Sequence, residues 1–71
     1  MSQARKYLAN NLKKFRTEKN YKREQLSLLL GFDNSYISKL EQGNINITLD
    51  RLELIANALE IEVAELLKKN S

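Results

Sequence analysis

A single glycine, Gly31, separates two short stretches in which apolar residues recur at helical spacing. The inward positions are Leu26 and Leu30 before the glycine, and Ile37 and Leu40 after it. Residues three or four apart lie on one face of a helix, so each stretch predicts a short amphipathic helix. Glycine adopts the left-handed backbone conformation that ends a helix, and Asp33 offers a side-chain oxygen that can cap the next one. The segment 23–42 therefore predicts two helices joined by a tight turn.

The small side chain of Ser27 is predicted to face the second of these helices, which permits close packing between the two. Two helices held at a steep angle by a short glycine-containing turn form a helix-turn-helix, the motif that places its second helix in the major groove of DNA. The segment therefore indicates a protein that binds DNA.

The remainder of the chain predicts three further helices, over residues 7–19, 49–59 and 63–69. Asn20 can end the first of these in the left-handed conformation. No segment alternates apolar and polar residues for long enough to indicate a strand, and the chain contains no proline. We therefore expect an all-α fold of five helices in one domain over residues 1–71, with a core at about 7–69 and a flexible arm at 1–6.

Four pairs of apolar residues define the helix starts. The expected N-caps are Lys22, Asp33, Thr48 and Glu62. Each is preceded by an apolar residue and followed by another at the fourth helical position, in the pairs Tyr21/Leu26, Phe32/Ile37, Ile47/Leu52 and Ile61/Leu66. This is the hydrophobic-staple spacing, in which contact across the cap fixes the angle at which the chain enters the helix. Lys22 and Glu62 lack a short side-chain oxygen, so their helices should fray at the start or begin one residue away.

Composition excludes several other classes of protein. The 71 residues suffice for one modest core, and 42% of them are hydrophobic. The absence of cysteine and histidine removes disulfides, thiolate zinc sites and histidine general bases, so we expect no cofactor, no metal and no enzymatic activity. The longest apolar runs, such as Leu28–Leu30, have three residues, far below the roughly 20 residues of a membrane span, and the N-terminus lacks the apolar core of a secretion signal. We expect a cytoplasmic protein.

The charges are distributed unevenly along the chain. Residues 1–40 carry nine Lys or Arg and three Asp or Glu, a net charge of +6, whereas residues 41–71 carry a net charge of −3. One surface is thus suited to a polyanion and another would repel it, which favours nucleic acid bound in one orientation. The alternative is that the basic helix faces are only solvated surface.

A set of residues spread over the chain carries a family resemblance. They are Arg16, Leu26, Ser27, Leu30, Gly31, Asp33, Tyr36, Ile37, Ser38, Glu41, Gly43, Leu49, Leu52, Ala56 and Leu59. On these positions the segment 12–67 resembles the phage-repressor family of helix-turn-helix proteins, the XRE type that includes lambda repressor, Cro and controller proteins. The resemblance implies a five-helix DNA-binding bundle.

The chain departs from the family pattern at several positions. Lys22 and Arg23 stand where Thr-Gln or Ser-Gln is common, and the glutamine there typically touches a phosphate. A guanidinium also binds phosphate well, so Arg23 substitutes one donor for another. Ile47 stands where proline is common, and Glu60 stands where glycine usually ends the fourth helix, which leaves the end of that helix open.

Helical phase and the resemblance together identify residues expected to touch DNA. Base contacts are expected from Asn34, Ser35, Ser38 and Lys39. Contacts to the DNA backbone are expected from Lys22, Arg23, Tyr36, Gln42 and Asn44. Amides suit adenine and lysine suits guanine, but no arginine is present among the base contacts, so we expect phosphates and DNA shape to supply much of the affinity. Two alternatives stay open: Tyr36 as a ring packed beside the preceding helix, and Asn34 as a plain helix-start residue.

Arg16 and Glu41 form a predicted structural pair. Members of the family often pair an arginine in the first helix with the glutamate that follows the recognition helix, and both residues occupy matching positions. Such a pair would lock the third helix against the first. The alternative is two solvated charges, which contribute little energy.

The resemblance also implies self-association through the fourth and fifth helices and the loop before them. The expected interface residues are Leu49, Ile61, Leu66 and Leu67. A two-fold dimer would present its recognition helices one DNA turn apart, on an inverted repeat with half-sites roughly 10 base pairs apart. Leu28 and Ile45 have no obvious core role and are either isolated exposed residues or a partner surface.

We therefore expect a sequence-specific transcriptional regulator that binds double-stranded DNA as a homodimer on an inverted-repeat operator. The alternative is a DNA-binding antitoxin or protein-interaction adaptor whose partner binds Leu28 or the C-terminal helices. The expected partners are double-stranded DNA and a second copy of the chain, with no membrane and no small-molecule ligand.

Overall fold

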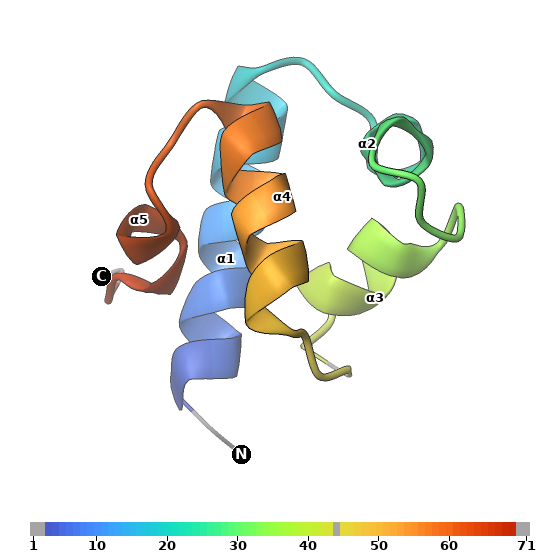
Figure 1. The fold of residues 1–71 in the computed structure, drawn as a ribbon. Coiled ribbons are helices and arrows are strands. Elements are labelled where there is room, and N and C mark those ends of the chain that lie inside the picture. Colours follow the sequence, from blue (N-terminus) through green and yellow to red (C-terminus); the bar gives the residue numbers. More distant parts are fainter. Residues whose placement is uncertain (1–2, 44, 70–71) are drawn as a thin grey trace.

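A computed structural model of the protein describes residues 3–43 and 45–69, and this part of the chain folds into five helices joined by short loops (Figure 1). In chain order they are α1 (Gln3–Glu18), α2 (Arg23–Leu29), α3 (Tyr36–Glu41), α4 (Leu49–Leu59) and α5 (Val63–Leu67). The all-α class and the number of helices predicted from the sequence are confirmed. None of the described helices has the length and apolar character needed to span a membrane.

Helix α1 is the element on which the bundle is assembled. It packs against α5 and α3, while α2 packs on α3 and α4 packs on α5. Figure 1 shows α2 and α5 at opposite ends of the molecule, with the other helices between them. The core consists of Leu8, Leu12, Leu26, Tyr36, Ile37, Leu40, Leu52, Ile55, Ala56, Leu59 and Leu66. Every helix contributes to this core, so the α2–α3 pair is fixed to the rest of the fold.

The predicted staples are packed. Their helical members Leu26, Ile37, Leu52 and Leu66 are buried, and the residues before the caps, Tyr21, Phe32, Ile47 and Ile61, lie partly buried against the same core. Thr48 caps α4, since its Oγ1 accepts a hydrogen bond from Arg51 N–H at 3.2 Å. Lys22 and Glu62 are caps without a side-chain acceptor, as predicted. Gln25 Oε1 compensates at α2 by accepting a hydrogen bond from Lys22 N–H at 3.2 Å.

Residues in the left-handed conformation follow α1, α2, α3 and α4, whereas α5 is followed by Lys68 in an extended conformation. Asn20 takes this role after α1, as predicted, and Gly31 takes it in the turn after α2. Glu60 occupies the family's glycine position and ends α4 at φ 59°, a backbone region that costs energy for a residue with a side chain. Its carboxylate accepts a hydrogen bond from Lys19 Nζ at 2.5 Å. This bond and the positive charge of Lys19 lower the pKa of Glu60.

Two helix boundaries and one apolar residue differ from the prediction. The expected arm at 1–6 is wrong for residues 3–6, because α1 already begins at Gln3, and Gln, Ala, Arg and Lys are all good helix formers. Helix α5 ends at Leu67 rather than near residue 69. Asn11 explains this end, because its Nδ2 donates to the carbonyl oxygens of Leu66 at 3.0 Å and Lys68 at 2.8 Å. Ile45 does have a core role, since it packs against the buried cluster.

Candidate nucleic-acid interface

The contact between α2 and α3 depends on Ser27, which is fully buried. Its hydroxyl donates to the Arg23 carbonyl oxygen at 2.9 Å and accepts from Ile37 N–H at 3.1 Å. The Ile37 N–H lies in the first turn of α3, where backbone donors have no partner within the helix. A short hydroxyl side chain thus both permits close approach and joins the two helices. The predicted orientation of Ser27 is confirmed.

The start of α3 differs from the prediction. The N-cap is Ser35 rather than Asp33, and Asn34 and Ser35 lie in the turn before the helix. The physical reason is a competing local bond: Asp33 Oδ1 accepts from Ser35 N–H at 3.0 Å and from Ser35 Oγ at 3.2 Å, which stabilises a turn ahead of the helix. The hydrogen bond from the Ser35 backbone is the main cause that lowers the pKa of Asp33, followed by the Ser35 hydroxyl and, more weakly, the charge of Lys39.

The starts of α2 and α3, together with the end of α1, surround a hollow of about 550 Å³, which we name the recognition hollow. Its lining residues are Arg16, Lys22, Arg23, Glu24, Asn34, Ser35 and Ser38. Five of these are predicted DNA contacts, brought together from two helices and the turn between them. Two more are exposed but do not line it: Lys39 on α3 and Gln42, the residue that follows the helix. Of the two remaining predicted contacts, Tyr36 is buried and Asn44 lies outside the described residues.

Arg16, which lines the recognition hollow, is paired with Glu41 at the end of α3. Arg16 Nε lies 2.6 Å from Glu41 Oε2, and Arg16 Nη2 lies 3.2 Å from Glu41 Oε1. The side chains are only 11% and 6% exposed, so the pair is buried rather than solvated. Arg16 Nη1 also donates to the carbonyl oxygen of Tyr21 at 2.7 Å. Glu41 Oε1 lies 3.7 Å from Arg23 Nη1, which connects the ion pair to the start of α2.

Tyr36 is packed rather than presented to solvent. The residue is 9% exposed, and its hydroxyl oxygen is buried without a hydrogen-bond partner in the described part of the chain. Its ring centre lies 4.6 Å from that of Phe32, and the Arg51 guanidinium carbon lies 5.1 Å from it. This conformation contradicts the predicted backbone contact and agrees with the alternative of a packed ring. The sequence analysis did not identify Arg51, because nothing near this residue in α4 indicates that it packs on the rings of Phe32 and Tyr36.

The four residues predicted for self-association are not equally accessible. Leu49 is 65% exposed and Leu67 is 39% exposed, while Ile61 is partly buried against the core. Leu66 is fully buried, so its assignment to the interface is wrong. On the short helix α5, docking against α1 decides which of two neighbouring leucines faces inward, and Leu66 is the one that does.

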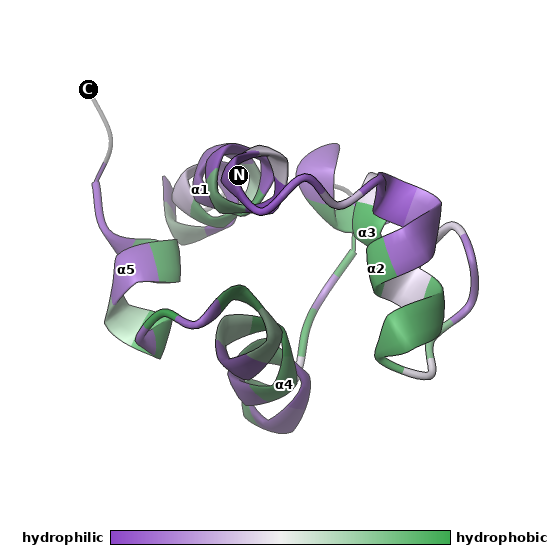
Figure 2. Cartoon of the chain, turned by 90° about the horizontal axis from the view of Figure 1, so that it is seen from above, coloured by the Kyte–Doolittle hydropathy of each residue, from purple (hydrophilic) through white to green (hydrophobic). Residues whose placement is uncertain are grey.

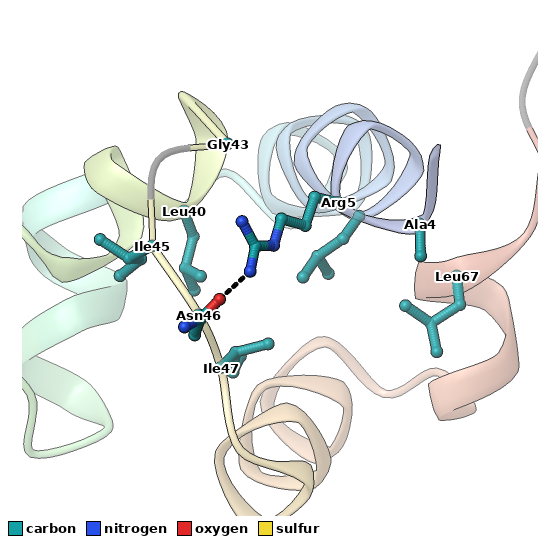
Figure 3. Close-up of a pocket in the computed structure, with 9 residues that line it drawn as sticks. Ala4, Arg5, Leu40, Gly43, Ile45, Asn46, Ile47 and Leu67 are labelled. Atoms are coloured by element: carbon teal, nitrogen blue, oxygen red, sulfur yellow. Dashed lines mark hydrogen bonds between the residues drawn. The ribbon is translucent and has the colours of Figure 1, made fainter. Parts of the chain in front are cut away.

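Leu67 borders a second hollow, of about 300 Å³, which we name the basal hollow. Its lining residues are Ala4, Arg5, Leu8, Leu40, Gly43, Ile45, Asn46, Ile47 and Leu67. Figure 3 shows Arg5 reaching across it to Asn46, whose Oδ1 accepts a hydrogen bond from Arg5 Nη2. Within the described residues, no group of three His, Cys, Asp or Glu side chains could hold a metal ion.

Comparison with known proteins identifies the fold. A hypothetical transcription factor of Neisseria meningitidis is 36% identical over 63 residues, which are 89% of this chain and 59% of that protein, so the chain spans less than two thirds of that relative. A crystal structure of the hypothetical transcription factor NHTF from Neisseria superposes with a TM-score of 0.89 at 35% identity, covering 93% of this chain and 76% of that one.

Controller proteins are also similar to the chain. The control protein C.SmaI of Serratia marcescens is 36% identical over 62 residues, which are 87% of this chain and 74% of that protein. The controller protein C.Esp1396I, crystallised as a tetramer with its natural 35 base-pair operator, gives a TM-score of 0.78 at 32% identity and covers 96% of this chain and 100% of that one. A family model described as Helix-turn-helix matches residues 12–66. The chain belongs to this helix-turn-helix family, of the phage-repressor and Cro type.

Proposed function

We propose that this protein is a sequence-specific regulator of transcription that binds double-stranded DNA as a homodimer on an inverted-repeat operator. The observation that carries the proposal is the recognition hollow, which gathers side chains from two helices and their turn on one face. Its residues are three cations, of which Arg16 is paired with Glu41, together with one carboxylate, two hydroxyls and one amide. The members of this set other than Arg16 suit phosphates and base edges together. Membership of a helix-turn-helix family supports the same reading.

The residues divide into those suited to phosphate and those suited to bases. Lys22 and Arg23 at the start of α2 fit phosphates, because a charge-assisted hydrogen bond is strong and independent of sequence. Glu41 Oε1 lies 3.7 Å from Arg23 Nη1 and attracts it electrostatically. The Arg23 side chain is nevertheless 53% exposed, so its guanidinium is accessible to DNA. Ser38 and Lys39 on α3 and Asn34 in the turn before it fit base edges in the major groove.

We propose Leu49 and Leu67 as the centre of the two-fold contact, with Ile61 at its margin. Both leucines are exposed, and the basal hollow beside Leu67 offers apolar surface that a partner side chain can fill. In a two-fold contact the same patch is used on both copies, and the two α3 helices then face successive turns of one groove. The operator should accordingly be an inverted repeat with half-sites roughly 10 base pairs apart.

The relatives support a DNA-binding regulator. C.Esp1396I was crystallised as a tetramer with its own operator, and C.SmaI is a control protein. On the helix-turn-helix match we also propose a cytoplasmic protein without catalytic activity.

The proposal is tested by selecting binding sites from a pool of random duplexes at two salt concentrations. Enrichment of an inverted repeat with the stated spacing, bound more weakly at higher salt, is the expected result, since each phosphate contact releases counterions. Failure to enrich any sequence, or enrichment of a single unrepeated site bound as a monomer, would overturn it.

A further inference from the structure

The outer face of α1 carries two exposed lysines, Lys6 and Lys13, which we name the α1 lysine pair. They lie seven positions apart in the sequence, close to two turns of the helix, so both side chains project from the same face. The ion pairs found within the described residues involve Arg16, Lys19 and Arg23, and neither member of the lysine pair. Both ammonium groups are therefore available to an external anion.

Arg16 shows which way this face of α1 points. It follows Lys13 by three positions, so the two side chains lie on neighbouring parts of the helix, and Arg16 lines the recognition hollow. Leu8 and Leu12 point from α1 into the core, about 100° or more around the helix from either lysine. Figure 2 shows α1, α3 and the hydrophilic start of α2 along one side of the molecule, with α4 on the other. The α1 lysine pair therefore faces the same side as the recognition hollow.

The charge on this side of α1 is positive. Residues 1–17 carry five Lys or Arg and no Asp or Glu. The first acidic residue, Glu18, follows Lys13 by five positions and so projects about 140° away around the helix. Glu41 at the end of α3 is 6% exposed, and its carboxylate is held by Arg16 and Arg23. This face accordingly suits a polyanion.

The position of α1 beside α3 indicates which part of a DNA duplex it would meet. A helix seated in the major groove, which is about 12 Å wide, has a sugar-phosphate strand on each side. Helix α3 packs against both α1 and α2, and Figure 2 shows it between them. Lys22 and Arg23 lie at the start of α2, so the phosphate contacts proposed above serve the strand on the α2 side. The α1 lysine pair lies where cations for the other strand are needed.

We propose that Lys6 and Lys13 bind phosphates of the DNA strand on the α1 side of the groove, opposite the strand held at the start of α2. This inference deepens the proposed function and rests on it. The two residues are separated by roughly 10 Å along α1, and lysine carries a compact charge on a flexible stem. They add affinity without base preference, because phosphates are the same in every sequence.

The experiment removes both lysines and measures how strongly salt weakens DNA binding. The test variant is the double substitution Lys6→Gln with Lys13→Gln. Its matched control, Lys68→Gln with Lys69→Gln, removes the same charge from two exposed residues that follow α5, which Figure 1 places at the end of the molecule away from α2. Glutamine is a good helix former and all four positions are exposed, so the helical content and the sedimentation of all three proteins should agree.

Binding to the selected operator is measured by fluorescence anisotropy between about 50 and 200 mM salt. Each phosphate contact adds about 0.9 to the slope of log K against log salt concentration, so the slope of the test variant should be shallower by about 2. At 0.1 M salt its affinity should fall on the order of tenfold per lysine, by the same factor for the operator and for random duplexes. The control variant should keep the wild-type slope.

Ethylation of single phosphates locates the contacts on the duplex. For the wild type and the control, ethylation should block binding on both strands that border α3 in each half-site, whereas the test variant should become insensitive to ethylation of one of these two strands. An unchanged salt slope in the test variant, or an equal decrease in the test and control variants, overturns the inference. A wild-type protein that selects no duplex would instead refute the proposed function.

Discussion

Replacing Glu41 by Gln tests whether the buried ion pair holds α3 against α1. The change removes a carboxylate that is 6% exposed and leaves the Arg16 guanidinium, 11% exposed, with the Tyr21 carbonyl as its remaining strong acceptor. Breaking one side of a buried pair costs about 3–5 kcal/mol, and we expect the lower figure because the glutamine oxygen can still accept one hydrogen bond. A domain of this length has a total stability of about 4–10 kcal/mol, so Glu41→Gln should lower the Tm by roughly 10–20 °C.

The measurement is urea unfolding followed by circular dichroism for Glu41→Gln, Arg16→Met and the double variant. Methionine keeps much of the apolar stem of arginine, so this double-mutant cycle measures the interaction energy of the two charges with little contribution from lost packing. The double variant should be destabilised by about 2 kcal/mol less than the sum of the single changes, because it leaves no buried charge unpaired. Lys19→Met at the exposed pair with Glu60 is the control and should move the midpoint little. Additive losses in the double-mutant cycle would show that Arg16 and Glu41 act as independent solvated charges.

Three further outcomes are expected. Lys39→Ala should cost about 1–3 kcal/mol at the selected operator and change the base preference at one position per half-site, whereas Arg23→Gln should weaken all sequences equally and reduce the salt slope by about 1, both measured by fluorescence anisotropy. Glu60→Gly should raise the Tm in thermal unfolding, because glycine adopts φ 59° without strain. The pKa of Asp33 is lower in the folded than in the unfolded protein, so its ionised carboxylate stabilises the fold at pH values above the unfolded-state pKa. The extra stability of the wild type over Asp33→Asn should therefore disappear as the pH falls through the folded-state pKa, which NMR titration of the carboxyl group measures.

The parts of the fold that were predictable depend on local chemistry. The spacing of the four staples places one apolar residue on each side of a cap, and all eight members contact the core. Thr48 and Asn20 act through bonds and dihedral angles within a few residues of themselves. Such features are determined by neighbours in the chain, so the sequence suffices to identify them.

The errors arise where distant parts of the chain decide between alternatives of similar local energy. Leu66 and Leu67 are adjacent on a helix of five residues, and contact with α1 turns Leu66 inward. Tyr36 is covered by Phe32 and by Arg51 from α4. The Asp33 side chain accepts a hydrogen bond from Ser35 N–H, so α3 begins at Tyr36 and Asp33 is not its cap. Helix propensity does not indicate which of these two local hydrogen-bond arrangements is more stable.

For the candidate site, helical phase and the glycine turn predicted three of the contacts that line the hollow, Asn34, Ser35 and Ser38, whereas Lys22 and Arg23 were predicted from the family resemblance. The base edge or phosphate that each one meets depends on the position of the DNA, which is not determined by the sequence of this chain. The ion pair of Arg16 with Glu41 joins residues 25 positions apart, and only the family resemblance, not their spacing, indicated it.

The central claim is that two copies of this chain act together on one inverted repeat. Sedimentation velocity of the protein with a duplex carrying the selected operator measures this directly, with the monomeric variant Leu67→Glu as comparison. We expect two wild-type chains per duplex. For the variant we expect loss of tight binding with unchanged helical content, because a single half-site supplies few phosphate and base contacts. One wild-type chain bound per duplex with full affinity would contradict this claim.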